Sequence, residues 1–152
     1  KDTFFDIRRY MNAGNARIMG REFGTVIYGA GKGIWKTFED YVNGAERYFL
    51  GKNALFYFGD LDFEGILIFE HLIEQKQYRE SGIHIFKEAY EKMLDKAWQL
   101  GFSRLPDMNE KQNANIGTSF LSAFDAERRH QILELLDMGK YIPQEILNEH
   151  DW

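Results

Sequence analysis

Apolar residues in the first hundred positions show two patterns, one with helical spacing and one of short runs typical of extended strands. Residues 1–12 repeat apolar side chains at helical spacing, and Gly14 follows them as a helix stop. Short apolar runs that are typical of strands occur at 25–28, 55–58 and 83–86. Helical spacing returns after each run, so the predicted order of elements is α-β-α-β-α-β-α.

This alternation predicts an α/β fold in which helices flank a parallel sheet on both faces. Ligand sites in such folds form beyond the carboxyl ends of the strands. Two loops of unusual composition occupy that position, a glycine-rich loop at 29–33 and an acidic turn at 59–62. These loops are therefore the first places to look for a functional site.

The pattern changes after residue 100. Residues 102–117 are mainly polar and predict an exposed loop, and two or three helices are expected between residues 118 and 149. Pro143 can begin the last helix, because a residue in the first turn needs no N–H donor. We expect a core at 1–100 and a loop with a helical C-terminal extension at 101–152.

Composition narrows the chemistry. The chain has 152 residues, and 44% of them are hydrophobic. It contains no apolar run long enough to span a membrane and does not begin with a charged-then-apolar leader, so a cytoplasmic protein is expected. It contains no cysteine, which leaves carboxylates and four histidines as possible metal ligands. The net charge of −5 argues against binding nucleic acid by bulk charge, although a local basic stripe or bound cations could still bind it.

Two acids follow the second predicted strand. Asp60 and Asp62 are two residues apart, so an extended backbone projects both to the same side, where their oxygens suit Mg²⁺ or Mn²⁺. The alternative is that Asp60 caps the next helix and Asp62 lies in a solvated turn. Glu64 either adds a third carboxylate to the metal site or favours the positive end of that helix.

The glycine loop contains Gly31, Lys32 and Gly33. Its bare backbone N–H groups and its lysine resemble a phosphate cradle at a helix start. It is not a Walker A loop, because that motif needs a second glycine at fixed spacing followed by Lys-Ser or Lys-Thr, whereas Gly33, Ile34 and Trp35 follow the lysine here. A tight turn that needs a positive φ is the structural alternative.

Other charged residues favour ordinary surface roles. Arg8 and Arg9 lie on the polar side of the first helix and Arg128 and Arg129 beside acids, which favours a solvated, locally paired surface over a DNA track. The histidines have no ligand spacing from one another and are interpreted as structural.

Four segments resemble one family in the same order. They are KDTFFDIRRYM, VIYGAGKGIWKTFEDY, YFGDLDFEG and KYIPQEIL. They are similar to the Toprim domain shared by the topoisomerase VI A subunit, the meiotic double-strand-break protein and, most closely, the nuclease JetD of the Wadjet anti-plasmid systems. Asp60, Asp62 and Gly65 match its D-x-D-x-x-G signature, and residues 142–145 resemble the closing Gln-Glu segment of JetD-like proteins.

The resemblance implies a Toprim, Rossmann-like core that lacks its first strand, with the glutamate of that strand expected two residues before Lys1. It implies Mg²⁺- or Mn²⁺-dependent cleavage of double-stranded DNA with Asp60 and Asp62 as metal ligands, and with Gly31, Lys32 and Gly33 against a phosphate. SMC-like motor partners are implied as well, and a homodimer is compatible with the family. A chain that starts at Lys1 is expected to be inactive by itself.

Two other functions stay open. A non-catalytic Toprim-like module would use the same loops to bind DNA or a protein partner. A phosphotransfer or phosphatase domain of similar shape would also place aspartates at strand ends.

Overall fold

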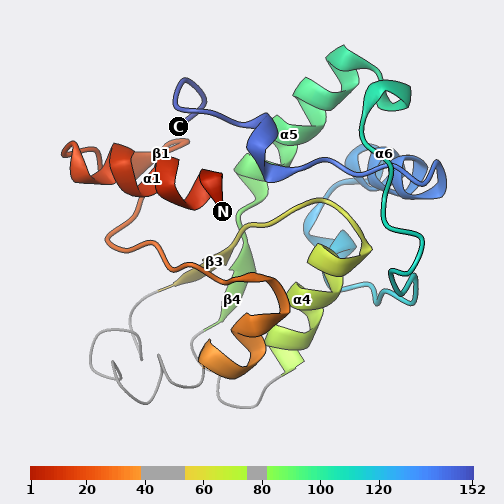
Figure 1. Ribbon diagram of the computed structural model, residues 1–152, viewed down its shortest axis with the longest axis horizontal. Coiled ribbons are helices and arrows are strands. Elements are labelled where there is room, and N and C mark those ends of the chain that lie inside the picture. Colours follow the sequence, from red (N-terminus) through yellow and green to blue (C-terminus); the bar gives the residue numbers. More distant parts are fainter. Residues whose placement is uncertain (39–53, 75–81) are drawn as a thin grey trace.

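The computed structural model describes residues 1–38, 54–74 and 82–152, and these form a mixed α/β structure (Figure 1). Its helices and strands are α1 (Asp2–Asn12), β1 (Arg17–Ile18), β2 (Arg21–Glu22), β3 (Leu55–Tyr57), α4 (Phe63–Glu74), β4 (Ile83–Ile85), α5 (Lys87–Leu100) and α6 (Ala126–Asp137). Short 3₁₀ turns are η1 (Gly31–Gly33), η3 (Phe102–Arg104), η4 (Leu121–Ala123) and η5 (Gln144–Ile146). Residues 34–38 are also helical.

The long amphipathic segments form the helices that their spacing predicts. The first helix, the helix after the acids and the helix after the third apolar run are confirmed as α1, α4 and α5. The helix expected after the glycine loop is confirmed over 34–38, and its remainder lies outside the described residues. The helices form where predicted because each buries one continuous apolar face.

The second and third apolar runs pair as a parallel sheet. Leu55 of β3 lies opposite Ile83 of β4, and Tyr57 lies opposite Ile85. Parallel strands need a crossover between them, and α4 lies on this connection (Figure 1). The α/β class is therefore confirmed in the form of a small two-stranded parallel sheet within the described part of the chain.

The strand predicted at 25–28 is wrong, because these residues form no strand. Val26 packs on the larger core cluster and Ile27 on a smaller one, so the apolar alternation reflects burial. A strand also requires a backbone partner, and no backbone hydrogen bond of 25–28 occurs within the described ranges.

A short hairpin that the pattern did not predict precedes this segment. β1 and β2 pair antiparallel through a two-residue turn at Met19 and Gly20, whose φ values of 47° and 80° are both positive. Two positive φ values are characteristic of a type I′ hairpin turn.

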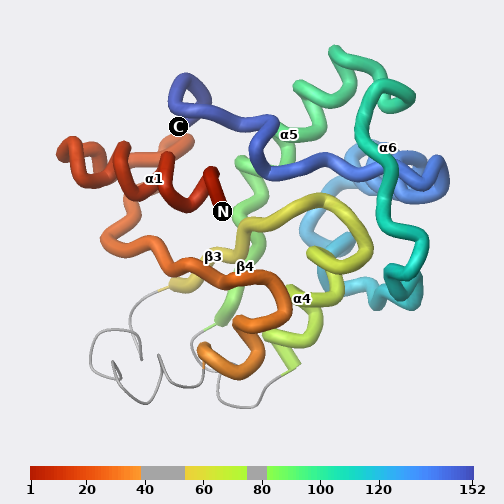
Figure 2. The backbone as a smooth tube through the Cα atoms, viewed as in Figure 1, coloured from red at the N-terminus to blue at the C-terminus, as the bar shows by residue number. Residues whose placement is uncertain are grey.

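The C-terminal third packs into the same core as the first two thirds. The ring of Tyr90 on α5 lies 5.1 Å from that of Phe120, and Phe120 lies 5.5 Å from Phe124. Of the helices expected between 118 and 149, α6 is a full helix, whereas η4 and η5 are single turns. The last residues run past α5 and end near α1 (Figure 2). The ring of Trp152 packs against that of Phe58.

No helix in the described ranges is both long enough and apolar enough to cross a membrane.

Candidate functional site

The acidic turn lies between the end of β3 and the start of α4. At its centre Leu61 is fully buried and pairs with Ile142 of the C-terminal segment. The amide nitrogen of Leu61 lies 2.9 Å from the carbonyl oxygen of Ile142, and the reverse hydrogen bond measures 3.2 Å. The turn is therefore held from both sides, by the sheet and by the C-terminal segment.

Asp62 caps the N-terminus of α4. Its Oδ1 accepts a 2.6 Å hydrogen bond from the amide of Gly65, and its Oδ2 accepts a 2.7 Å hydrogen bond from the side chain of Gln112. The side chain is only 7% exposed. The alternative in which Asp60 caps the helix and Asp62 is solvated is therefore wrong, because Asp62 is the residue immediately before the helix and accepts from the third helical amide.

Gly65 is required by the close approach of this helix to the turn. A Cβ atom there would lie 2.1 Å from the backbone oxygen of Asp60 and 3.2 Å from Oδ1 of Asp62. The carbonyl of Gly65 also accepts a 2.9 Å hydrogen bond from the hydroxyl of Tyr57. The glycine spacing after the acids thus has a steric cause in this chain.

Asp60 is held by the C-terminal segment. Its Oδ1 accepts a 2.8 Å hydrogen bond from the amide of Gln144, and its Oδ2 has no hydrogen-bond partner within the described residues. Burial raises the pKa of Asp60, the Gln144 amide opposes this rise, and the negative charges of Asp62 and Glu145 add to it. The charge of Asp62 is therefore one of the influences that disfavour ionisation of Asp60.

Tyrosine hydroxyls surround the acids. Burial raises the pKa of Tyr57 and of Tyr90, and the charges of Asp60 and Asp62 raise both further. The hydroxyl of Tyr90 accepts a 2.9 Å hydrogen bond from the amide of Gly59. These hydroxyls stay protonated at neutral pH and act as hydrogen-bonding groups.

The glycine loop meets the acidic turn through one ion pair. Nζ of Lys32 lies 3.0 Å from Oε2 of Glu64 in the first turn of α4. Ala30 and Gly31 have φ values of 52° and 62°, as the tight-turn interpretation requires at Gly31, whereas Gly33 has no positive φ. The structure thus brings Lys32 of the predicted loop to Glu64, one of the three predicted acids.

Two residues whose side chains form long-range hydrogen bonds to α4 or from it, Gln112 and Glu70, were missed by the sequence analysis. Gln112 lies in the polar stretch 102–117, and nothing in its sequence context distinguishes it. Glu70 is 8% exposed, and its Oε2 accepts a 2.5 Å hydrogen bond from the amide of Gly117. A signal existed for Glu70, because an acid four residues after the buried Ile66 lies on the apolar face of α4.

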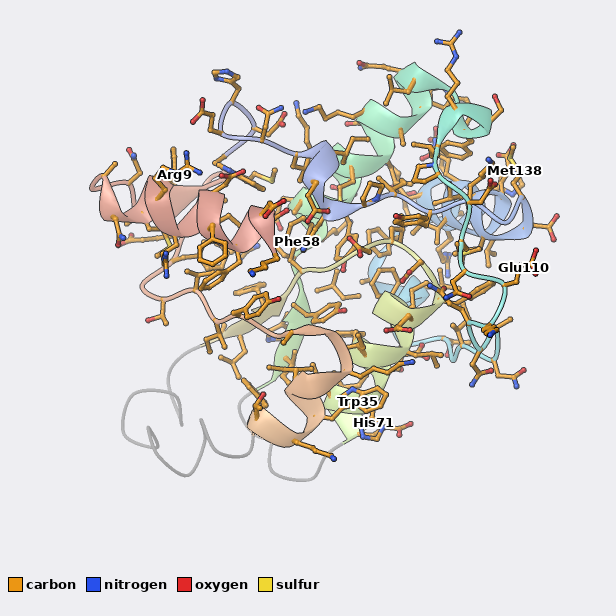
Figure 3. All side chains as sticks on the ribbon, in the orientation of Figure 1. Arg9, Trp35, Phe58, His71, Glu110 and Met138 are labelled. Carbon is orange, nitrogen blue, oxygen red and sulfur yellow. The ribbon has the colours of Figure 1, made fainter. Side chains whose placement is uncertain are left out.

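The basic pairs and the histidines behave mainly as surface and packing residues. Arg9 forms an ion pair with Asp6, and Arg128 forms one with Asp95. His71 lies against Trp35, with 4.4 Å between ring centroids (Figure 3). Among the described residues, no group of three or more histidines and acids is arranged to hold a metal ion.

The pair Asp60 and Asp62 fits only a sparsely ligated cation. Mg²⁺ is commonly bound in proteins by one or two carboxylates together with water and substrate phosphates. The open Oδ2 of Asp60 and the remaining lone pairs of Asp62 supply such a partial set of ligands. No protein-family model, curated protein or solved structure matches this chain.

Proposed function

We propose that this chain is a Toprim-like domain of a metal-dependent DNA-cleaving protein of the JetD or topoisomerase VI A type. The observation that carries the proposal is that Asp60 and Asp62 share the short turn between the end of β3 and the start of α4, where one carboxylate oxygen of Asp60 is left open. The parallel pairing of β3 with β4 across α4 supports the fold assignment, because ligand sites of parallel α/β folds lie at this edge.

A bound Mg²⁺ or Mn²⁺ would polarise the scissile phosphodiester and stabilise charge on the leaving oxygen. The chain itself fixes the ligands. Gln144 holds one oxygen of Asp60 and leaves the other open, and Gln112 holds Asp62 in one orientation. Lys32 can exchange Glu64 for a phosphate, because both side chains are exposed.

The proposed substrate is double-stranded DNA contacted through its backbone. Lysine and backbone amides address phosphates and carry no base information, so partners such as an SMC-like motor complex would choose the target. We expect binding to depend strongly on salt, because each phosphate contact releases counterions.

A passive binding module is the second candidate. The observation in its favour is that both oxygens of Asp62 already accept hydrogen bonds and the side chain is nearly buried. In that case Asp62 serves only as a helix cap, and the loops bind DNA or a partner without cleaving.

Calorimetric titration of this chain with Mn²⁺ tests the metal site first. Binding that is lost in both Asp60→Asn and Asp62→Asn, and kept in Asp137→Asn, supports the proposal. Asp137 is an exposed acid at the end of α6, so its substitution makes the same chemical change away from the turn. Mn²⁺ binding that is unchanged in Asp60→Asn and Asp62→Asn supports the passive module.

Plasmid cleavage by the natural full-length protein then tests the chemistry. Nicked or linear plasmid that requires Mn²⁺ and both aspartates supports the nuclease. Intact plasmid together with phosphate release from small phosphoesters would instead assign the acids to a phosphotransfer or phosphatase domain.

A further inference from the structure

An exposed cluster of aromatic and basic side chains lies on α1 and the segment that follows β2. We call the cluster formed by Phe4, Phe5, Arg8 and Tyr28 the α1 aromatic cluster. Phe5 is 37% exposed and Tyr28 is 41% exposed. The ring of Phe4 lies 5.4 Å from that of Phe5 and 5.3 Å from that of Tyr28, so the rings form one continuous group.

A cation without an acidic partner among the described residues lies against two of these rings, those of Phe4 and Phe5. The guanidinium of Arg8 lies 4.8 Å from the ring centroid of Phe5 and 5.6 Å from that of Phe4. Arg8 forms no ion pair within the described residues, whereas its neighbour Arg9 is paired with Asp6. Nζ of Lys1 also lies 5.9 Å from the ring centroid of Phe5. The expectation that Arg8 and Arg9 share one paired surface is thus met by Arg9 only.

The α1 aromatic cluster adjoins the candidate site along the chain. Tyr28 directly precedes the glycine loop at 29–33, and Lys32 of that loop reaches Glu64 at the start of α4. Figure 2 shows this stretch of chain running from beneath α1 toward α4. A polymer bound at the acids could therefore extend over the loop to the cluster.

Exposed rings beside an unneutralised guanidinium match a ligand with flat rings and negative charge. Nucleotides of a single strand have both, and aromatic residues together with arginine are the usual means of binding them. A base pair inside a duplex hides its ring faces in the helical stack. The chemistry therefore favours unpaired nucleotides over duplex at this cluster.

We propose that the α1 aromatic cluster binds unpaired nucleotides of a nucleic acid, with bases stacked on Phe5 and Tyr28 and a phosphate held by Arg8. This inference rests on the proposed function, because it takes the substrate of the acidic turn to be nucleic acid. It adds that the substrate carries a melted or single-stranded segment next to the site of cleavage.

Fluorescence anisotropy without divalent cation tests the cluster separately from the metal site. The probes are a labelled oligothymidine of about 12 nucleotides, a duplex of equal length, and a strand of abasic units with the same phosphates. We expect this chain to bind oligothymidine about tenfold more tightly than the abasic strand. Equal affinity for these two strands, or tighter binding of the duplex, would overturn the inference.

Matched variants locate the binding. Phe5→Leu and Tyr28→Leu keep apolar bulk but remove the aromatic face, and each should weaken oligothymidine binding about tenfold. Arg8→Gln should also weaken it, whereas Arg9→Gln, with the same loss of charge one residue away, should have little effect. Circular dichroism checks that each variant keeps its fold.

The outcomes separate this inference from the proposed function. Intact oligothymidine binding in a protein that never cleaves DNA would remove the nuclease and leave the cluster. If the Phe5→Leu protein still cleaves DNA and its affinity for oligothymidine is unchanged, the nucleotide-binding role of the cluster is wrong and the nuclease proposal remains. If no probe binds at any salt concentration, the inference is wrong.

Discussion

Asp60 shows at the scale of one residue how a functional carboxylate acts against stability. Burial and the neighbouring acids disfavour its ionised form, and the amide of Gln144 and the charge of the N-terminal amine oppose them. Asp60→Asn removes the charge but keeps an oxygen that accepts from Gln144. We expect this variant to be more stable than the parent at pH 7 without metal, with a melting temperature about 2–4 °C higher, the shift produced by roughly 1 kcal/mol in a domain of this size.

The pH dependence of this gain has a definite sign. The pKa of Asp60 is raised in the folded state above its ordinary value of 3.8, so the folded state binds the proton more tightly than the unfolded state does. The parent therefore loses stability as the pH rises from 3.8 through the folded pKa, and the asparagine variant does not. Thermal melts in EDTA from acid to neutral pH measure the difference.

Asp137→Asn is the control for that comparison, because Asp137 is exposed and lies away from the turn. Its melting temperature should stay close to that of the parent at every pH. A destabilised Asp60→Asn protein at pH 7 would mean that the ionised carboxylate stabilises the fold, and the account of its raised pKa would be wrong.

At the scale of elements, the junction of β3 and α4 depends on the absence of a side chain at residue 65. Gly65→Ala would place a Cβ atom 2.1 Å from the backbone oxygen of Asp60, which a helix start cannot accommodate without moving. We expect a loss of roughly 3 kcal/mol or more in the free energy of unfolding, from overpacking and from the weakened cap at Asp62. Urea denaturation measures this loss.

Gly24→Ala is the matched control, since a Cβ atom at Gly24 would meet nothing within 4 Å and its φ is not positive. That substitution should be neutral or slightly stabilising, because alanine restricts the unfolded chain. A Gly65→Ala protein as stable as the parent would contradict the described approach of α4 to the acidic turn.

The elements that the sequence predicts correctly are those that a local pattern decides. α1, α4 and α5 each follow from side chains within one helix, and β3 and β4 follow from short apolar runs. Residues 25–28 have the same apolar composition but form no strand, because strand formation also depends on a backbone partner elsewhere in the chain.

Only part of the candidate site can likewise be predicted from local sequence. The placement of Asp60 and Asp62 in one turn follows from their spacing of two residues, and the position of Gly65 follows from their motif. The hydrogen bonds of Gln112 and Gln144 do not, because they join residues 50 and 84 positions apart in the sequence. No periodicity within one segment contains information about such contacts.

On the scale of the whole molecule, the last residues complete the turn that the first two thirds form. Ile142 pairs with Leu61, Gln144 binds Asp60, and Trp152 packs on Phe58 directly before the acids. The C-terminal segment is therefore part of the candidate site, and its removal would expose both the buried turn and its carboxylate.

A pair of substitutions at Gln144 tests this coupling. Gln144→Pro removes the N–H that Asp60 accepts, and Pro143 already has the extended ψ of 141° that a following proline requires. Residue 144 is also the first of η5, where proline is tolerated. Gln144→Ala removes the side chain and keeps the N–H, so any difference between the two proteins reports on the hydrogen bond to Asp60.

We expect Gln144→Pro to raise the pKa of Asp60 further, because the lost hydrogen bond favours the ionised carboxylate. Mn²⁺ affinity should fall about tenfold or more, as it does when a hydrogen-bond partner of a metal ligand is removed. Carbon-detected NMR titration of Asp60 measures the first effect and calorimetry the second, while Gln144→Ala should match the parent in both. Equal pKa values in the two variants would show that the C-terminal segment only covers the turn and does not tune it.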